Sequence, residues 1–272
     1  MKKLLLALVL VSTGAQAQYQ GAWGLYDYEL HEYQTVYNRS EVRPIASITK
    51  LFTATTILRS GVDLQERVKV QGTSGGRFPR GTMVSRNDLL KAMLISSDNL
   101  AAETLANTYP SGFNGFILDT NQWVQGLRLI NTKIVDASGL LPGNVSNVDD
   151  LVSLLYRIKD YPVIRDIARE KNETLRIPKG KKKELRINLR NTNPSLFQFD
   201  NILISKTGFT NPAGRCVIML VEKGRELHAV IILGQRNIVE RSRIAEELIT
   251  KNPLPKPSLL PPDEIIKFNF AL

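Results

Sequence analysis

The chain has 272 residues, of which 43% are hydrophobic, and carries 36 Lys and Arg against 26 Asp and Glu, a formal net charge of +10. That length is ample for a hydrophobic core and fits one large domain or two interleaved lobes. A single cysteine excludes an intramolecular disulfide. The two histidines do not have the spacing of metal ligands, which argues against a zinc peptidase. The basic net charge alone does not identify a partner.

The N-terminal residues follow the order of an export signal. Lys2 and Lys3 give a positive start, an apolar run extends from residue 4 to residue 11, and Ala15-Gln16-Ala17 supplies a small-x-small cleavage site. The apolar run is far shorter than the ~20 residues that span a bilayer. We therefore expect residues 1–17 to be a signal peptide that is cleaved after Ala17, which would release the mature protein into the periplasm or the medium.

The predicted elements change from strands to helices and back along the chain. Loose alternation over 21–37 predicts two strands of a hairpin. Apolar residues that recur every three or four positions predict helices near 48–58, 88–95, 100–105, 113–127 and 149–158. Short β-branched runs predict strands at 202–205, 216–221 and 227–233, and the pattern of 241–249 predicts a closing helix. Early strands must then pair with late ones, with the helical region inserted between them.

This order predicts a domain from 18 to 251 that consists of two lobes. We expect a sheet lobe made of 18–46 and 161–251, a helical lobe made of 47–160, and a Pro-rich tail over 252–272 without an amphipathic membrane anchor. We interpret the basic turn Lys179–Lys183 as solvated in preference to a contact with anionic wall polymer. We expect Cys216, which lies in an apolar run, to be a buried and unreactive thiol.

Ser47 and Lys50 form an S-x-x-K motif at the start of a predicted helix. A serine hydroxyl is a poor nucleophile unless a neighbouring base takes its proton, and residues three apart lie on one helix face. Lysine acts as a base only if desolvation or a nearby cation lowers its pKa, and Lys206 could be that cation. By itself the motif is weak, and the alternative is that Ser47 is a helix N-cap.

The pattern S-x-N occurs twice in the chain. Ser85-Arg86-Asn87 precedes Asp88 and an apolar helix, which predicts N-capping. Ser97-Asp98-Asn99 instead interrupts two helices. There Ser97 could relay a proton to a leaving amine, and Asn99 could hydrogen-bond Lys50 or a substrate amide.

A K-T-G motif, Lys206-Thr207-Gly208, follows the β-prone run 202–205. Lys206 and Thr207 could hold a substrate carboxylate by charge and hydrogen bond, and Gly208 would let a substrate backbone approach closely. The trio S-x-x-K, S-D-N and K-T-G together is the signature of penicillin-binding proteins and class A β-lactamases.

Longer stretches around these motifs resemble the low-molecular-mass penicillin-binding proteins, a family of serine D-Ala-D-Ala peptidases, and in particular their shorter endopeptidase branch. The similar stretches are 42–51, 96–102 and 206–214, together with 136–140 and 190–193. The likeness covers roughly residues 20 to 250.

This resemblance implies a β-lactamase/transpeptidase-like fold of the α/β (α+β) class, with a five-stranded antiparallel sheet flanked by helices beside an all-helical lobe. It implies that Ser47 forms the acyl-enzyme, Lys50 is the base and Ser97 the proton relay, with Asn99 beside them. It also implies that the substrate binds along Lys206, Thr207, Gly208, Phe209 and Thr210, and that the N–H groups of Ser47 and Phe209 form the oxyanion hole. No metal and no organic cofactor are implied.

The implied partners are peptidoglycan stem peptides as substrates and β-lactam antibiotics as covalent inhibitors, with no nucleic acid and no stable membrane anchor. The leading hypothesis is a DD-endopeptidase that cuts D-alanine cross-links, and the second is a DD-carboxypeptidase that removes terminal D-Ala. A β-lactamase is third, because Glu184–Asn188 only loosely mimics its E-x-x-L-N pattern and is interpreted as an exposed strand. The fourth is a non-catalytic wall-binding module.

Overall fold

The computed structural model describes residues 21–179 and 183–250. The predicted signal peptide, the middle of the basic turn and the Pro-rich tail lie outside the described residues. Among the helices of the described part, none is long and apolar enough to cross a membrane.

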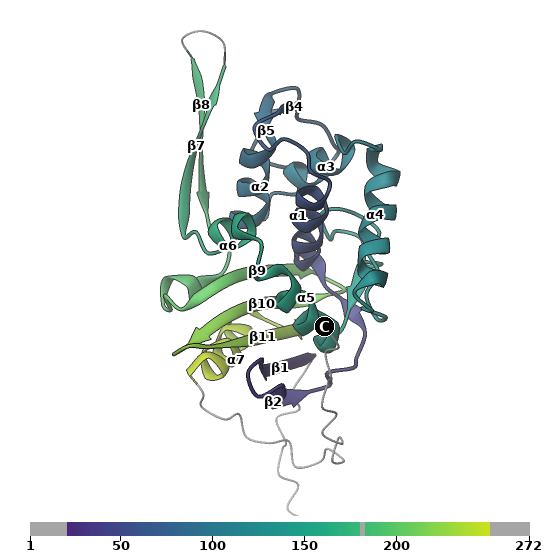
Figure 1. The fold of residues 1–272 in the computed structure, drawn as a ribbon. Coiled ribbons are helices and arrows are strands. Elements are labelled where there is room, and N and C mark those ends of the chain that lie inside the picture. The colour runs from purple at the N-terminus through teal and green to yellow at the C-terminus, as the bar shows by residue number, and fades with distance from the viewer. Residues whose placement is uncertain (1–20, 180–182, 251–272) are drawn as a thin grey trace, which may run out of the picture.

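A five-stranded antiparallel sheet joins the two ends of the described chain (Figure 1). Its strand order is β2-β1-β11-β10-β9, with β1 at Ala22–Asp27, β2 at Glu32–Tyr37, β9 at Ile202–Thr210, β10 at Gly214–Lys223 and β11 at Glu226–Gln235. The predicted N-terminal hairpin and the predicted pairing of the last two strands are confirmed. Because early β1 pairs with late β11, the helical region is inserted between the two parts of the sheet, as predicted.

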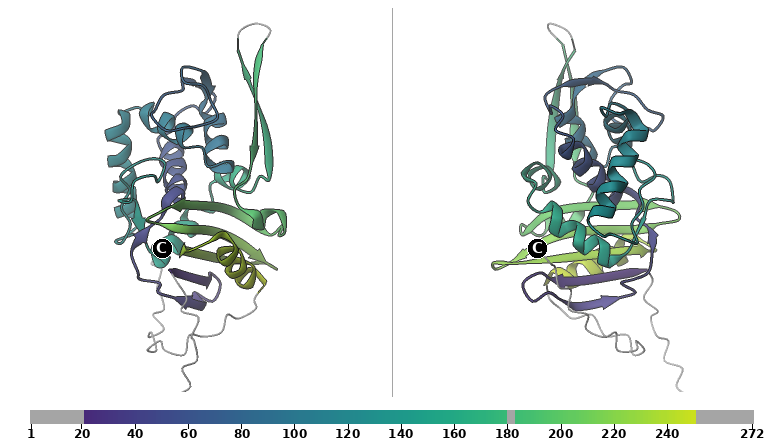
Figure 2. Two further views of the ribbon diagram at one scale, coloured as in Figure 1. Left: turned by 180° about the vertical axis from the view of Figure 1, so that it is seen from behind. Right: turned by 45° about the vertical axis from the view of Figure 1, so that its right-hand side comes forward.

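Helices cover both faces of this sheet (Figure 2). The helices are α1 (Thr49–Arg59), α2 (Arg86–Ile95), α3 (Asn99–Asn107), α4 (Gly112–Gly126), α5 (Val148–Ile158), α6 (Pro162–Ala168) and α7 (Ile238–Thr250), with 3₁₀ turns η1 (Ala46–Ile48) and η2 (Pro194–Phe197). Alternate strand residues point to opposite faces. On one face Val217, Met219 and Val230 pack with α7, and on the other Ile218, Leu220 and Ile231 join the core shared with the helical region. The predicted α+β fold class is therefore confirmed.

Short elements complete the fold. The minor strand pairs are β3 (Arg43–Pro44) with β6 (Val145–Ser146), β4 (Arg67–Lys69) with β5 (Met83–Ser85), and β7 (Asn172–Pro178) with β8 (Glu184–Arg190). The sequence pattern did not predict α6, because seven residues are too few to show a helical period. Helix α5, which the sequence placed in the helical lobe, packs against β1 and β11 of the sheet.

Strand β9 is longer than predicted. It continues through Thr210, so the K-T-G motif lies inside the strand and not after it. The added residues Lys206 to Thr210 keep pairing with β10, from Ile218 to Gly214. Since β9 is the last strand in the sheet order, the motif lies on an edge strand of the sheet.

Candidate active site

Ser47 lies in the η1 turn that leads into α1, and Lys50 lies in the first turn of that helix. The fully buried Lys50 ammonium is within hydrogen-bonding distance of three oxygens: Ser47 Oγ at 2.9 Å, Asn99 Oδ1 at 2.7 Å and the Ser138 carbonyl at 2.6 Å. Neither η1 nor α1 begins with a side-chain cap. The N-cap interpretation of Ser47 is therefore wrong, because its hydroxyl contacts Lys50 instead of a backbone N–H.

Burial determines the proton affinity of Lys50. It lowers the pKa of Lys50 to about 7, against the opposing charges of Asp136, Asp98 and Glu103. A lysine in water has a pKa near 10.4, so it is almost wholly charged at neutral pH. In this site a substantial fraction of the amine is neutral at pH 7 and can accept a proton.

The S-D-N motif leads from α2 into α3, with Ser97 and Asp98 between the helices and Asn99 as the first residue of α3. Ser97 has a φ of 58°, a left-handed conformation that is uncommon for a residue with a side chain. Its Oγ accepts a 2.9 Å hydrogen bond from Lys206 Nζ. Asp98 has a structural role, since its carboxylate accepts from Ala101 N at 2.8 Å and from Arg77 N at 2.6 Å. The turn thus presents Ser97 and Asn99 to two different lysines.

Lys206 enters the site from β9. Its ammonium donates to Ser97 Oγ and to its neighbour's carbonyl, Thr207 O, both at 2.9 Å. Burial, followed by the positive charges of Lys50 and Arg241, lowers its pKa well below the usual value. Of the two causes considered for a lowered Lys50 pKa, desolvation or a nearby cation, desolvation is the larger. Arg241 of α7, which the sequence reading did not single out, adds positive charge to this region.

Thr207 and the two residues that follow the K-T-G motif, Phe209 and Thr210, have distinct surroundings. Thr207 Oγ1 is hydrogen-bonded to Thr192 Oγ1 at 2.6 Å. Phe209 is 47% exposed, and the Arg215 guanidinium lies 3.7 Å from its ring centroid. Thr210 Oγ1 accepts from Ala213 N at 3.3 Å and so closes the β9–β10 turn.

Gly208 has a packing role that the sequence reading did not foresee. A Cβ at this position would lie 2.9 Å from Ile45 O and 3.0 Å from Ser47 N. The glycine therefore lets the protein's own η1 turn pack on β9, whereas we had expected it to make room for a substrate backbone.

The loop Asp136–Gly139 packs against η1 and supports the site. Burial would raise the pKa of Asp136, but hydrogen bonds from Leu141 N, Gly139 N, the Asn144 amide and Ser138 N outweigh it and lower the pKa. These bonds hold the Ser138 carbonyl against Lys50. Their only sequence signal was the family resemblance of 136–140, because a loop has no period.

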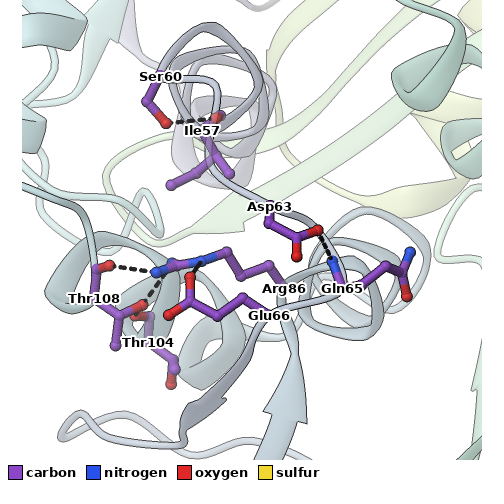
Figure 3. Close-up of polar contacts among 8 residues, drawn as sticks. All are labelled: Ile57, Ser60, Asp63, Gln65, Glu66, Arg86, Thr104 and Thr108. Carbon is purple, nitrogen blue, oxygen red and sulfur yellow. Dashed lines mark hydrogen bonds and ion pairs between the residues drawn. The ribbon is translucent and has the colours of Figure 1, made fainter.

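Several residues outside the site also match their predictions. Ser85 caps α2 by accepting from Asp88 N at 3.1 Å. Next to it, buried Arg86 donates to Glu66 and Thr108 and so ties α2 to the end of α3 (Figure 3). Cys216 is buried, and burial raises the pKa of its thiol to about 11. The first S-x-N pattern and the cysteine are therefore structural.

One group of side chains among the described residues has the composition of a metal site. It consists of Asp27, Glu226 and His228 on β1 and β11. Asp27 and His228 are buried cross-strand partners whose side chains approach to 3.1 Å, as in an ion pair. It shares no residue with the cluster of serines and lysines.

The family of D-alanyl-D-alanine carboxypeptidases matches residues 17–237, and the chain belongs to this family of serine D-Ala-D-Ala peptidases. The chain is 34% identical to the D-alanyl-D-alanine endopeptidase of Escherichia coli K12, over 80% of this chain and 73% of the relative. It is 37% identical to the D-alanyl-D-alanine endopeptidase of Pseudomonas aeruginosa, over 74% and 67%. Among solved structures it is similar to penicillin-binding protein D2 of Listeria monocytogenes in its ampicillin-bound form, with a TM-score of 0.75, 28% identity and coverage of 85% and 96%.

Proposed function

We propose that the protein is a penicillin-sensitive serine DD-endopeptidase that hydrolyses D-alanine cross-links of peptidoglycan through an acyl-enzyme on Ser47. The observation that carries this proposal is the 2.9 Å contact between Lys50 Nζ and Ser47 Oγ, in surroundings that lower the pKa of Lys50 to about 7. A neutral amine at this distance can take the serine proton as attack begins. Relatives at 34% and 37% identity are named endopeptidases, which favours cross-links as the substrate.

In the proposed acylation step Ser47 Oγ attacks the carbonyl carbon of a D-alanine residue and its proton passes to Lys50 Nζ. The C–N bond then breaks, and the leaving amine takes a proton from Ser97 Oγ, which regains one from the Lys206 ammonium at 2.9 Å. In the second half of the reaction a water molecule attacks the ester carbonyl and gives a proton through Ser97 to Lys206, the bond between the acyl carbon and Ser47 Oγ breaks, and Ser47 Oγ takes its proton back from Lys50. Asn99, at 2.7 Å from Lys50, orients the base.

The proposed oxyanion hole consists of the N–H groups of Ser47 and Phe209. Support comes from the close packing of β9 on η1, since a Cβ at Gly208 would lie only 3.0 Å from Ser47 N. Donors that point at the developing negative charge are worth several kcal/mol in such sites. The substrate backbone is proposed to lie along Lys206 to Thr210, because β9 is an edge strand, to which an extended peptide can add as a further strand.

The proposal also includes export to the periplasm with cleavage after Ala17, and the division into a sheet lobe, a helical lobe and a C-terminal tail. Export is supported by the order of positive charge, apolar run and small residues in 1–17. The division into lobes is supported by the order of predicted strands and helices along the sequence. No membrane anchor, cofactor or nucleic acid enters the proposed reaction.

A β-lactamase is disfavoured by the position of Glu184. This residue begins β8, is exposed and contacts Arg186, so the glutamate of the loose E-x-x-L-N match lies at an exposed end of a strand. Its carboxylate therefore has no buried position from which to activate a water molecule for fast deacylation. A non-catalytic wall-binding module is disfavoured by the contact of Lys50 with Ser47.

Intact mass after brief incubation with benzylpenicillin tests the nucleophile. We expect an adduct of one drug mass on the wild type and none on Ser47→Ala. Ser60→Ala, at the other end of α1, is the matched control and should acylate like the wild type. No adduct and no drug hydrolysis in the wild type would reject the active-serine mechanism, and rapid hydrolysis without an adduct would indicate a β-lactamase.

A second assay separates the two peptidase activities. Purified protein is incubated with a cross-linked muropeptide dimer and, separately, with a monomer that ends in D-Ala-D-Ala. The endopeptidase proposal predicts monomers from the dimer. Release of free D-alanine without cleavage of the dimer would instead identify a carboxypeptidase.

A further inference from the structure

The β7–β8 hairpin carries half of the net charge of the chain. Residues 172–190 contain seven Lys or Arg and two Glu, a formal charge of +5 against +10 for all 272 residues. The hairpin projects from the sheet beside α2 (Figures 1 and 2). Its apolar face is buried in the main core and consists of Leu175, Ile177, Ile187 and Leu189. The charge is therefore concentrated on the opposite, solvent-facing side.

We define the basic face of the hairpin as Arg176, Lys179, Lys183 and Arg186, all of which are exposed. Arg176 and Arg186 are direct cross-strand partners, and like charges in that position destabilise a hairpin. Within the described residues Arg186 contacts Glu184, but Arg176 has no hydrogen-bond or ion-pair partner. An external anion between the two guanidinium groups would relieve this repulsion.

Few acids are available to neutralise this face from within the hairpin. Besides Glu184, the only acidic residue of 172–190 is Glu173, and its carboxylate pairs with Lys91 of α2 at 3.3 Å. That ion pair also fastens β7 to the helical region. The hairpin is thus held in place, and within 172–190 only Glu184 offsets the charge of its basic face.

The base of the hairpin is joined to the candidate active site. Ser96 Oγ donates to Arg190 O and accepts from Arg190 N, each at 3.2 Å, and Ser96 directly precedes the relay residue Ser97. Two residues past β8, Thr192 contacts Thr207 of the K-T-G motif at 2.6 Å. Because a strand rises about 3.3 Å per residue, Arg186 lies roughly 13 Å along β8 from Arg190. That distance matches about four residues of an extended peptide.

We propose that the basic face binds carboxylates of the second stem peptide in a cross-linked peptidoglycan substrate, the peptide that leaves as the amine. The inference rests on the proposed endopeptidase function, and it names the part of the substrate that the catalytic residues do not hold. A stem peptide fits because it is short, carries free carboxylates and extends away from the cleaved bond. Arginine holds carboxylates well, since its planar guanidinium donates two parallel hydrogen bonds.

The test measures affinity without turnover. In a Ser47→Ala background, isothermal titration with a cross-linked muropeptide dimer compares Arg176→Glu/Arg186→Glu with the control Arg157→Glu/Arg225→Glu. The control changes the charge equally at exposed positions on α5 and in the β10–β11 turn. We expect the hairpin pair to weaken binding about 5- to 30-fold, with a flatter salt dependence, and the control to stay within about twofold.

A dimer whose carboxylates are amidated provides the second probe. It should bind the hairpin variant and the control alike. Equal affinities of the two variants for the unmodified dimer would overturn the proposal, as would an equal loss with the amidated dimer. If the hairpin variant lost binding to vesicles that contain phosphatidylglycerol but kept its affinity for the dimer, the basic face would be assigned to a lipid surface instead.

The same charge variants with Ser47 intact separate this inference from the proposed function. Benzylpenicillin should label the hairpin variant, which would show that the site still folds. Absence of labelling would mean that damage to the site, and not loss of anion binding, explains the lower affinity. If the wild type did not cleave the dimer, the endopeptidase function would fail. The affinity comparison in the Ser47→Ala proteins is read without cleavage and would still decide the role of the hairpin.

Discussion

Replacing Asn99 by Asp should move the pH dependence of acylation to higher pH. In the wild type the side-chain oxygen of Asn99 lies 2.7 Å from Lys50 Nζ, and the pKa of Lys50 is about 7. Asp has the same shape but brings a full negative charge, which favours the charged lysine. An adjacent opposite charge raises such a pKa by about 1–2 units, or roughly 1.4–2.7 kcal/mol of preference for the ammonium.

The expected change in rate follows from the neutral fraction of Lys50. At pH 7 that fraction is about one half for a pKa of 7, about one in ten for 8 and about one in a hundred for 9. Acylation by benzylpenicillin should therefore be about 5- to 50-fold slower at pH 7 in the variant and should recover as the pH rises above the new pKa. For the wild type the rate should rise through pH 7 and level off above it, since only the neutral amine accepts the serine proton.

The assay is the second-order rate of adduct formation by intact mass, from pH 5.5 to 10. Asn114→Asp on the exposed side of α4 introduces the same charge and should leave the midpoint near 7. A midpoint that stays near 7 in Asn99→Asp, or moves to lower pH, would refute the assignment of Lys50 as the base. A uniform loss of rate at every pH would show that Asn99 acts through its amide group and not through the charge state of Lys50.

Three further predictions concern the support of the site and the thiol. Asp136→Asn should lower the free energy of unfolding by about 1–3 kcal/mol at pH 7, as measured by thermal unfolding, because the amide cannot accept all the hydrogen bonds that the carboxylate accepts. Since the folded-state pKa of Asp136 is lowered, the contribution of its carboxylate to stability is present at neutral pH and is lost as the pH falls through that value. A difference in stability between variant and wild type that persists in strong acid would contradict the reasoning. Gly139→Ala should abolish penicillin labelling, because φ is +83° and a Cβ would overlap the carbonyl of Ala46; labelling at the wild-type rate would show that the loop adapts. With a pKa of about 11, roughly one in a thousand Cys216 thiols is ionised at pH 8, so iodoacetamide should label it only after denaturation, and rapid labelling of the folded protein would show that it is accessible.

Much of the fold followed from the hydrophobic pattern of the sequence. Helices α1 to α5 and strands β9 to β11 have apolar residues at regular spacing, and burial of those residues is what orders the elements. Helix α6 and the two-residue strands β3 and β6 were not predicted, because their stability comes from neighbours and not from a period of their own.

The candidate site was only partly visible in the sequence. The spacing of Ser47 and Lys50 predicts their contact, since both are on one short segment. The Ser138 carbonyl comes from 88 positions later in the chain, and a backbone carbonyl has no residue-type signal. For Gly208 the residue type was noticed, but the close approach of η1 of the same protein was not foreseen. Contacts between distant segments of this kind depend on the tertiary fold.

Backbone strain at the site is concentrated next to its two serines. Ala46, which precedes Ser47, has a φ of 47°, and Ser97 itself has a φ of 58°. A left-handed conformation at a residue with a side chain costs of order 1–3 kcal/mol and persists only where the surroundings hold it. Here the surroundings are specific, since Gly139 packs under Ala46 and Asp98 caps α3 beside Ser97. Each serine is thus held in a turn whose direction is set by a neighbouring segment, so that both hydroxyls meet the buried lysines before any substrate arrives.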